Sequence, residues 1–318
     1  MNAWLFTGGQ AVLGLALLYF GGEWLVRGAS ALAARLGVSP LAIGLTVVAF
    51  GTSAPELVVS LQAALSGSSD IAVGNVVGSN IANIGLILGI AAVIQTLEVH
   101  ANIIRVDVPL MIAASILLLA LLADGEISRV EGGLLLIGLI AYVGYTLWQS
   151  RRETAEIQAE FAAGRPRADG SVLHQLLLVG LGLAALVGGG NALVGAAVTI
   201  AAGFGVSEAL IGLTIVAIGT SLPELAASTI AAFRGQGDIA LGNVIGSNLF
   251  NVLGILGVTA SVTPLPRGGV AWSTLGVMLA FALVLWPFAL SQRRLVRLEG
   301  IALVAAYAGY IGWLAMTA

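Results

Sequence analysis

Two glutamates stand inside long apolar stretches, and each directly follows a proline. Glu56 ends the sequence GLTVVAFGTSAPE, and Glu224 ends GLTIVAIGTSLPE 168 positions later. A carboxylate at such a depth in a membrane costs about 2.5–3.5 kcal/mol on insertion scales. A structural acid bonded to a neighbouring helix is the alternative, but no basic residue lies at a comparable depth in the chain. We therefore expect a cation from solution to neutralise the two acids.

The residues before each glutamate predict a break in its helix. The strings GTSAP and GTSLP end in proline, which cannot donate a backbone hydrogen bond and disfavours helical geometry at the preceding residue. Unwound backbone inside a membrane is tolerated only where it is buried in protein or lines a cavity. A kink without any ligand is the alternative. We expect carbonyl and hydroxyl oxygens at the break to be hard ligands, and the candidates are Ala49, Thr52, Ser53, Ala217, Thr220 and Ser221.

A second duplicated stretch supplies amides and hydroxyls at the same offset of 168. The segment DIAVGNVVGSN, residues 70–80, matches DIALGNVIGSN, residues 238–248. Polar residues four apart form one stripe on an otherwise apolar helix. Interhelical hydrogen bonding is the alternative role for this stripe. It contains Asn75, Ser79 and Asn83 in the first copy and Asn243, Ser247 and Asn251 in the second.

The available ligand types restrict the kind of ion. Carboxylates, carbonyls and hydroxyls suit calcium or sodium, whereas transition metals favour His and Cys. Calcium takes about six to eight oxygens at roughly 2.3–2.6 Å. The chain has no cysteine, so disulfides and thiolate metal sites are excluded.

The composition is that of a membrane protein. Hydrophobic residues make up 58% of the 318-residue chain and charged residues only 9%, where a soluble domain has about 25% charge. Because a helix needs about 20 apolar residues to cross a bilayer, hydropathy predicts ten spans. They are 3–22, 38–63, 71–96, 103–122, 130–148, 173–193, 206–232, 239–262, 270–290 and 298–316.

The repeat and the span count together predict the topology. Five helices per half make the second copy enter the membrane from the opposite side, so the repeats are inverted, at 1–148 and 172–318. The polar stretch 149–171 is expected to be a cytoplasmic linker. All 13 basic residues are Arg, and eleven of them fall on one side, which predicts that both termini lie outside.

Enzymatic chemistry finds no support in the sequence. The string Gly235-Gln236-Gly237-Asp238 matches the GxGD string of intramembrane aspartyl proteases, but these need a second Asp that follows a Tyr, and no Tyr-Asp pair exists here. N-capping is the better explanation of Asp70 and Asp238. We expect no enzyme, no cofactor and no nucleic-acid partner.

At these motifs the chain resembles the sodium/calcium exchanger family of the cation/calcium exchanger superfamily. GTSAPE and GTSLPE, with GNVVGSNIANIG and GNVIGSNLFNVLG, look like its two alpha-repeats. The resemblance implies ten helices, antiport of calcium against sodium and four clustered cation sites. It implies that Glu56 and Glu224 hold calcium with the Thr52 and Thr220 carbonyls. The implied sodium ligands and central residues are Ala49, Thr52, Ser53, Ser79, Ala217, Thr220, Ser221, Ser247, Asn83 and Asn251.

One departure concerns Asn251, because archaeal relatives carry Asp there, although animal members also carry an amide. The resemblance also implies alternating access by sliding of helices one and six across a fixed core. A calcium/proton antiporter using the same two glutamates is the alternative, and a channel is disfavoured by the duplicated site. Exclusive use of Arg as the basic residue, with heavy Ala and Gly usage, suggests a bacterial inner membrane, where we expect the protein to act as a monomer.

Overall fold

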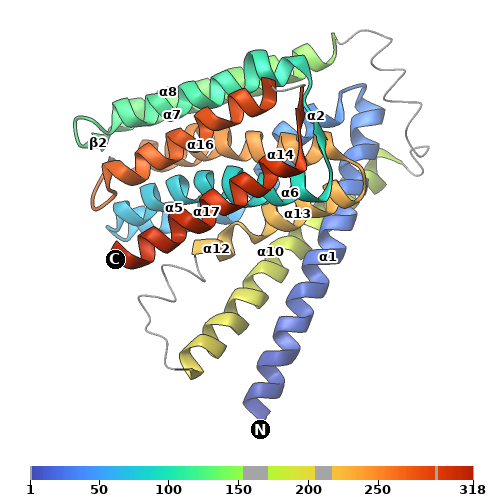
Figure 1. Ribbon diagram of the computed structural model, residues 1–318, viewed down its shortest axis with the longest axis horizontal. Coiled ribbons are helices and arrows are strands. Elements are labelled where there is room, and N and C mark those ends of the chain that lie inside the picture. The colour runs from blue at the N-terminus through green and yellow to red at the C-terminus, as the bar shows by residue number, and fades with distance from the viewer. Residues whose placement is uncertain (1, 153–170, 205–216, 291–292, 318) are drawn as a thin grey trace.

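The computed structural model is a bundle of helices with two short strand pairs (Figure 1). It describes residues 2–152, 171–204, 217–290 and 293–317. Within these ranges, eight helices are long and apolar enough to cross a membrane, or nine if one bent pair counts as a span. The all-helical membrane fold is therefore confirmed. The ten predicted spans are not all recovered, because residues 205–216 of the span 206–232 lie outside the described ranges.

The helical segments follow one another in the order that Figure 1 colours from blue to red. They are α1 (Asn2–Leu36), α2 (Pro40–Ile43), η1 (Gly44–Val48), α3 (Ala49–Thr52), α4 (Ala54–Leu65), α5 (Ser69–Ala82), η2 (Asn83–Leu88), α6 (Gly89–Ile94), η3 (Ile103–Asp107), α7 (Val108–Leu121), α8 (Arg129–Ser150), α10 (Val172–Gly203), α12 (Ala217–Thr220), α13 (Leu222–Phe233), α14 (Gly237–Leu249), η5 (Phe250–Ile255), α15 (Leu256–Val262), α16 (Trp272–Leu290) and α17 (Arg297–Thr317), where η marks π-helix.

Two helices are much longer than the hydropathy predicted. α1 has 35 residues and α10 has 32, whereas spans 3–22 and 173–193 were predicted. At 1.5 Å per residue they measure about 52 and 48 Å, well beyond a hydrocarbon core of about 30 Å. Figure 1 shows both leaving the body of the bundle at an angle to α7, α8, α16 and α17. The predicted ends were wrong because a tilted helix can continue past the apolar core.

Glycines allow α1 and α10 to pack closely side by side. A Cβ on Gly21 would lie 2.8 Å from the Leu186 backbone nitrogen, and one on Gly189 would lie 2.8 Å from the Gly14 carbonyl oxygen. Small residues permit this backbone approach where apolar side chains would hold the helices apart. The glycines of α1 at this contact recur every seven residues, at Gly14, Gly21 and Gly28. A seven-residue repeat keeps one seam between two helices.

The two strand pairs connect the halves of the chain reciprocally. β1 (Leu97–Glu98) pairs with β4 (Arg294–Leu295), and β2 (Glu126–Ile127) pairs with β3 (Leu265–Pro266). The offset of 168 relates β1 to β3 and β2 to β4. Each pairing is therefore the other one with the halves exchanged. Such reciprocal contacts are what a two-fold relation between two copies produces.

The predicted breaks occur at single residues. Ser53 separates α3 from α4 with φ −84° and ψ 8°, and Ser221 separates α12 from α13 with φ −89° and ψ 8°. In the first copy the two half-helices are bent by 45°. Pro55 and Pro223 then stand at the second position of α4 and α13, where the missing N–H costs nothing.

The centre of the bundle is the continuous helical segment from α14 to α15. In the most apolar 18-residue stretch of Gly237–Val262 every residue is buried, whereas only 17% of the residues are buried in the corresponding stretch of Arg297–Met316. A Cβ on Gly246 would lie 2.5 Å from the Leu45 carbonyl oxygen, and one on Gly242 would lie 2.8 Å from the Leu41 carbonyl oxygen. These two glycines, four residues apart, therefore let α14 approach the backbone of α2 and η1 closely. For Gly74 and Gly78, the corresponding partner segment 209–213 lies outside the described residues.

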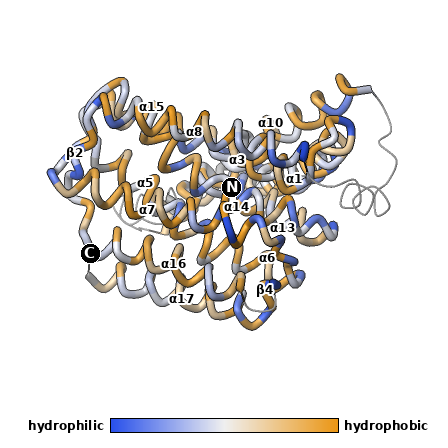
Figure 2. The backbone as a smooth tube through the Cα atoms, turned by 90° about the horizontal axis from the view of Figure 1, so that it is seen from above, coloured by the Kyte–Doolittle hydropathy of each residue, from blue (hydrophilic) through white to orange (hydrophobic). Residues whose placement is uncertain are grey.

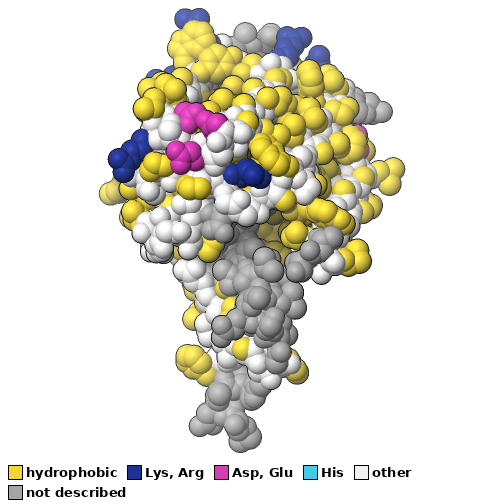
Figure 3. Space-filling view, turned by 90° about the vertical axis from the view of Figure 1, so that its left-hand side faces the viewer, with side chains coloured by type: hydrophobic (Ala, Val, Ile, Leu, Met, Phe, Trp, Pro, Cys, Tyr) yellow, Lys and Arg dark blue, Asp and Glu magenta, His cyan; other side chains and the backbone are white. Residues whose placement is uncertain are grey.

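The surface agrees with immersion in lipid. Figure 2 shows hydrophobic residues along the helices, with hydrophilic residues towards the connections such as β2 and β4. Figure 3 shows one face on which charged side chains are few and apolar side chains are widely spread. Exposed Leu134, Ile137 and Ile140 on α8 are examples, at 60%, 63% and 71%. Apolar side chains at such exposure face acyl chains at no hydrophobic cost.

Substitutions among the three consecutive glycines of α10, residues 188–190, test the close packing of α10 against α1. We expect Gly189→Ala to destabilise the protein by about 1–3 kcal/mol, because the added methyl group overlaps α1. Gly188→Ala is the matched control, since its Cβ meets nothing within 4 Å and alanine favours a helix. Thermal unfolding in detergent measures both, and equal stability of the two variants would contradict the packing described.

Candidate cation-binding site

The two glutamates lie in the first turns of the half-helices that follow the breaks. Glu56 is the third residue of α4, and Glu224 is the third residue of α13. Each side chain is 1% exposed. The N-terminal end of a helix carries a partial positive charge, so each break places its acid where the backbone stabilises a carboxylate.

The carboxylates are held crosswise by serines of the opposite half. The Ser53 hydroxyl donates to Glu224 Oε1 at 2.7 Å, and the Ser221 hydroxyl lies 3.3 Å from Glu56 Oε1. Ser221 Oγ also lies 3.3 Å from Ser79 Oγ. Each glutamate thus contacts the break residue of the other repeat, which brings the two acids into the same region of the bundle.

No arginine neutralises either acid among the described residues. The ion pairs found there are His100–Asp238, Arg234–Glu23 and Arg294–Glu98. All three involve groups at segment ends. Two carboxylates buried together without a basic partner are costly when ionised, because their charges repel each other in a medium of low dielectric. Within the described part of the chain, no ion pair offsets the charge of these two acids.

Two asparagines brace the breaks in the same reciprocal way. Asn243 donates to the Glu224 carbonyl at 3.5 Å and to Ser228 Oγ at 2.9 Å, and its Oδ1 accepts from Thr52 Oγ1 at 3.1 Å. Asn75 makes the equivalent bonds to Glu56, Ser60 and Thr220 at 3.3, 3.0 and 3.5 Å. These bonds fix the positions of the half-helices. Asn75 and Asn243 therefore form hydrogen bonds between helices, which was the alternative role of the polar stripe.

Further amide contacts join α5 to η5 and to α14 at the centre. Asn251 Nδ2 donates to Asn80 Oδ1 at 2.9 Å, and Asn80 Nδ2 donates to the Asn248 carbonyl at 3.4 Å. Asn83 begins η2 and Asn251 lies in η5, so both belong to π-helix. π-Helical turns occur frequently at functional sites because they displace side chains from the regular helical register.

Several buried oxygens in this region have no hydrogen-bond partner. Buried polar atoms are normally satisfied, so an unsatisfied group calls for an explanation. All but one of these atoms belong to carboxylates or amides, which offer oxygen to a cation. The unsatisfied atoms of predicted site residues are Glu56 Oε2, Glu224 Oε2, Asn83 Oδ1, Asn251 Oδ1 and Ser247 Oγ.

Some predicted details differ in the structure. The Ala49 carbonyl is not free, because it accepts from the Ser53 N–H at 3.1 Å and from the Thr52 hydroxyl at 3.3 Å. The break is too short to release it. Ser221 N–H bonds to the Ile218 carbonyl at 3.1 Å, and the side chain of Ala217 lies outside the described atoms. Asp238 is not an N-cap; its carboxylate bonds to His100 Nε2 at 3.1 Å.

Sequence reasoning missed two features of the site. Ser60 and Ser228 support the asparagine braces, and their offset of 168 was available as a signal. The π-helical segments at Gly44–Val48, Asn83–Leu88 and Phe250–Ile255 had no signal in the sequence. A π-turn depends on how neighbouring helices pack, and its residue types are those of any apolar helix.

Comparisons with known proteins agree with this site. The sodium/calcium exchanger protein family matches residues 7–148 and 174–316. A protein named putative antiporter CaxA from Alkalimonas amylolytica is 43% identical over 305 residues, covering 94% of this chain and 95% of the relative. Inner membrane protein YrbG of Escherichia coli is 39% identical, covering 96% and 94%.

A solved structure has the same fold. The sodium-calcium exchanger NCX_Mj, in crystals soaked with 2.5 mM Na⁺ and 0.1 mM Ca²⁺, superposes with a TM-score of 0.84 and 35% identity. The match covers 96% of this chain and 98% of that one. Fold and comparisons together define a multi-pass membrane transporter, and two buried glutamates lie at its centre. The chain belongs to the sodium/calcium exchanger family.

The asparagine brace can be tested through stability. We expect Asn243→Leu to cost about 1–3 kcal/mol, because it leaves the Thr52 and Ser228 hydroxyls and the Glu224 carbonyl without their partner in a buried place. Asn191→Leu on exposed α10 is the control and should change stability little. Thermal unfolding of both variants in detergent checks this, and an unaffected Asn243→Leu protein would refute the brace.

Proposed function

We propose that the protein is a secondary antiporter that exchanges calcium for sodium across the membrane by alternating access. The observation that carries the proposal is the buried pair Glu56 and Glu224. Among the residues that the structure describes, the pair has no basic partner, and each carboxylate keeps one oxygen without a hydrogen bond. Two ionised carboxylates have a charge of −2. One Ca²⁺ or two Na⁺ neutralise them, which makes the two cargoes mutually exclusive.

The ligand set proposed for the ions follows the duplicated motifs. Glu56 and Glu224 hold calcium together with the Thr52 and Thr220 carbonyls. Hydroxyl and amide oxygens of both halves complete the sodium sites, because oxygen ligands suit these hard cations. These further ligands are Ala49, Ser53, Ser79, Asn83, Ala217, Ser221, Ser247 and Asn251.

The ten-helix inverted arrangement supplies the orientation. The reciprocal strand pairs support two inverted halves of five helices, 1–148 and 172–318, joined by a cytoplasmic linker at 149–171. The strand pairs also mark the two ends of the bundle. Arg294, predicted to be cytoplasmic, lies in the β1–β4 pair, and Arg267, predicted to be outside, lies next to the β2–β3 pair. We place the β1–β4 end in the cytoplasm and both termini outside, in a bacterial inner membrane. We also propose that the protein acts as a monomer.

Calcium uptake into proteoliposomes tests the exchange reaction. We expect an imposed sodium gradient to drive uptake of radiolabelled calcium and a pH gradient alone to drive none. Glu56→Gln and Glu224→Gln should each weaken calcium binding by roughly 100-fold, since loss of one charged ligand costs a few kcal/mol. Glu126→Gln, at an exposed strand position, is the matched control. Sodium-independent uptake driven by protons would instead make the protein a calcium/proton antiporter.

The alternating-access step is proposed to be a sliding of α1 and α10 across the motif helices. The α1 helix packs less extensively against the core than against α10. Its contacts with the core include that of Gly22 with Ile230 of α13. The Arg234–Glu23 ion pair, with bonds of 2.6 Å, is another. An exposed ion pair contributes little stability, so it can break during movement.

A disulfide between α1 and the core tests the sliding step. The chain has no cysteine, and a Cβ on Gly22 would lie 3.4 Å from Ile230 Cβ, close to the spacing of about 3.5–4.5 Å in disulfides. We expect oxidised Gly22→Cys/Ile230→Cys protein to bind calcium and to transport none until it is reduced. Gly28→Cys/Leu178→Cys links α1 to α10 and should leave transport intact. Transport through the oxidised core-linked protein would exclude sliding.

A further inference from the structure

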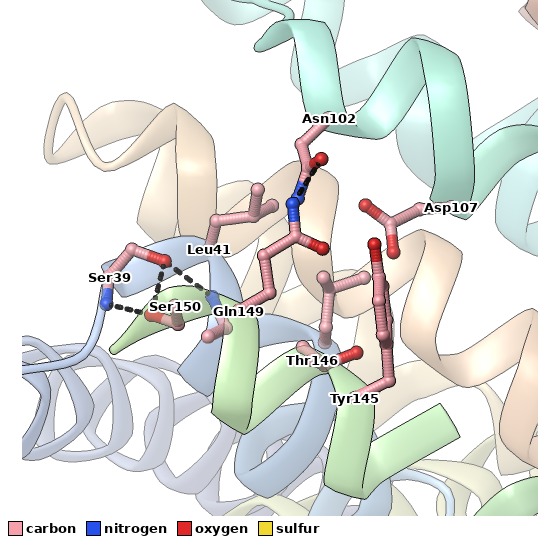
Figure 4. A pocket seen from close by; sticks show the side chains of 10 residues that line it. Ser39, Leu41, Asn102, Asp107, Tyr145, Thr146, Gln149 and Ser150 are labelled. Carbon is pink, nitrogen blue, oxygen red and sulfur yellow. Dashed lines mark hydrogen bonds between the residues drawn. The ribbon is translucent and has the colours of Figure 1, made fainter. Parts of the chain in front are cut away.

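A second polar pocket lies away from the glutamate pair, where α2, η3 and α8 meet (Figure 4). Its apolar wall includes Leu41, Ala42 and Leu45 of the first half. The motif residues of the cation site do not line it. The residues with polar side chains in the lining are Ser39, Asn102, Asp107, Tyr145, Thr146, Gln149 and Ser150.

Asp107 is a buried acid that the exchange mechanism does not use. Its side chain is 3% exposed, and Oδ1 accepts a hydrogen bond from the Tyr142 hydroxyl at 3.2 Å. Asp107 takes part in none of the ion pairs among the described residues. One hydroxyl does not balance a buried carboxylate, which is stable inside a membrane only when it is paired or meets a cation.

Oxygens from neighbouring side chains complete the pocket. Gln149 donates its amide to Asn102 Oδ1, which leaves Gln149 Oε1 buried and without a hydrogen-bond partner. Figure 4 shows this oxygen on the side of the Gln149 amide that faces Asp107. Ser150 Oγ accepts from the Ser39 N–H at 2.7 Å and lies 3.1 Å from Ser39 Oγ. No arginine or histidine lines the pocket among the described residues.

The described part of the other repeat carries apolar residues at three of the equivalent positions, so the scaffold does not need polar residues there. At the offset of 168, Asp107 corresponds to Leu275, Asn102 to Val270, and Thr146 to Leu314. Leu275 is fully buried and Val270 is 9% exposed. The same fold is therefore built with apolar residues at the equivalent positions of the second half. Polar residues retained in one half at a cost point to a function in that half.

We propose that this pocket binds one sodium ion, separately from the sites at Glu56 and Glu224. A single carboxylate with neutral oxygens balances one positive charge, and the enclosed space is about that of one water molecule. Leu45 lines the pocket and lies one helical turn before Ala49 of the central site. The pocket therefore lies beside the helical segment η1–α3, which also carries Ala49, and next to Ser150 at the C-terminal end of α8. Only the choice of sodium as the occupant rests on the proposed function.

Sodium-dependent thermal stability tests the pocket in a protein whose central site is disabled. In full-length Glu56→Gln/Glu224→Gln protein, replacing choline by Na⁺ at constant ionic strength should raise the Tm by a few degrees. Adding Asp107→Leu, which copies Leu275, or Asp107→Asn should abolish this shift. Glu126→Gln is the control and should leave it unchanged. Binding in this background does not depend on transport, so the pocket and the exchange reaction fail or succeed independently.

Each other outcome overturns the proposal. An absent sodium shift in the double-glutamine protein, or one that survives both Asp107 variants, excludes a sodium site here. A Tm that follows pH and ignores sodium makes the pocket a protonation site. If the Asp107 variants do not fold, Thr146→Leu, which copies Leu314, takes their place and should weaken the sodium response at least about tenfold, equivalent to one lost ligand. An unchanged response in that variant also excludes the site.

Discussion

Two carboxylates repel each other at the centre of a medium that screens charge poorly, and the architecture around them follows from that constraint. Each acid is held by the serine at which the opposite half-helix breaks. The bonds cross, so neither half can form the site alone. The asparagine braces repeat this exchange, and they join each half-helix to the opposite repeat. If the proposed site is correct, stability and ion binding depend on neighbouring contacts.

A rigid acidic centre can serve two sides of a membrane if another part of the protein moves. The α1–α10 pair has the necessary properties, because glycines hold the two helices tightly to each other and an exposed ion pair joins α1 to the core. In the proposed mechanism, neutralisation by a cation would remove the electrostatic cost of closing apolar helices over the site. An empty, charged site would resist closure. The proposal therefore couples occupancy to movement, which would permit exchange without leak.

Much of this arrangement was predictable because the sequence motifs that form it occur twice in the chain. The offset of 168 identified Glu56 and Glu224 as a pair, and proline chemistry placed the breaks beside them, as found at Ser53 and Ser221. The π-helical turn at Asn83 and the great length of α1 were not predictable, because both depend on packing and tilt. The hydrogen bonding of the Ala49 carbonyl was not predictable either, because it follows from a break that is only one residue long. Asp107 also escaped notice, since it stands in only one of the repeats.

Anomalous X-ray diffraction from crystals soaked in Ca²⁺ tests the central claim most directly. A single calcium ion should lie between Glu56 and Glu224 with a carboxylate oxygen of each in its coordination shell. Excess sodium in the soak should remove the calcium signal without unfolding the site. A calcium ion bound elsewhere, or bound by one of the two acids alone, would contradict the account.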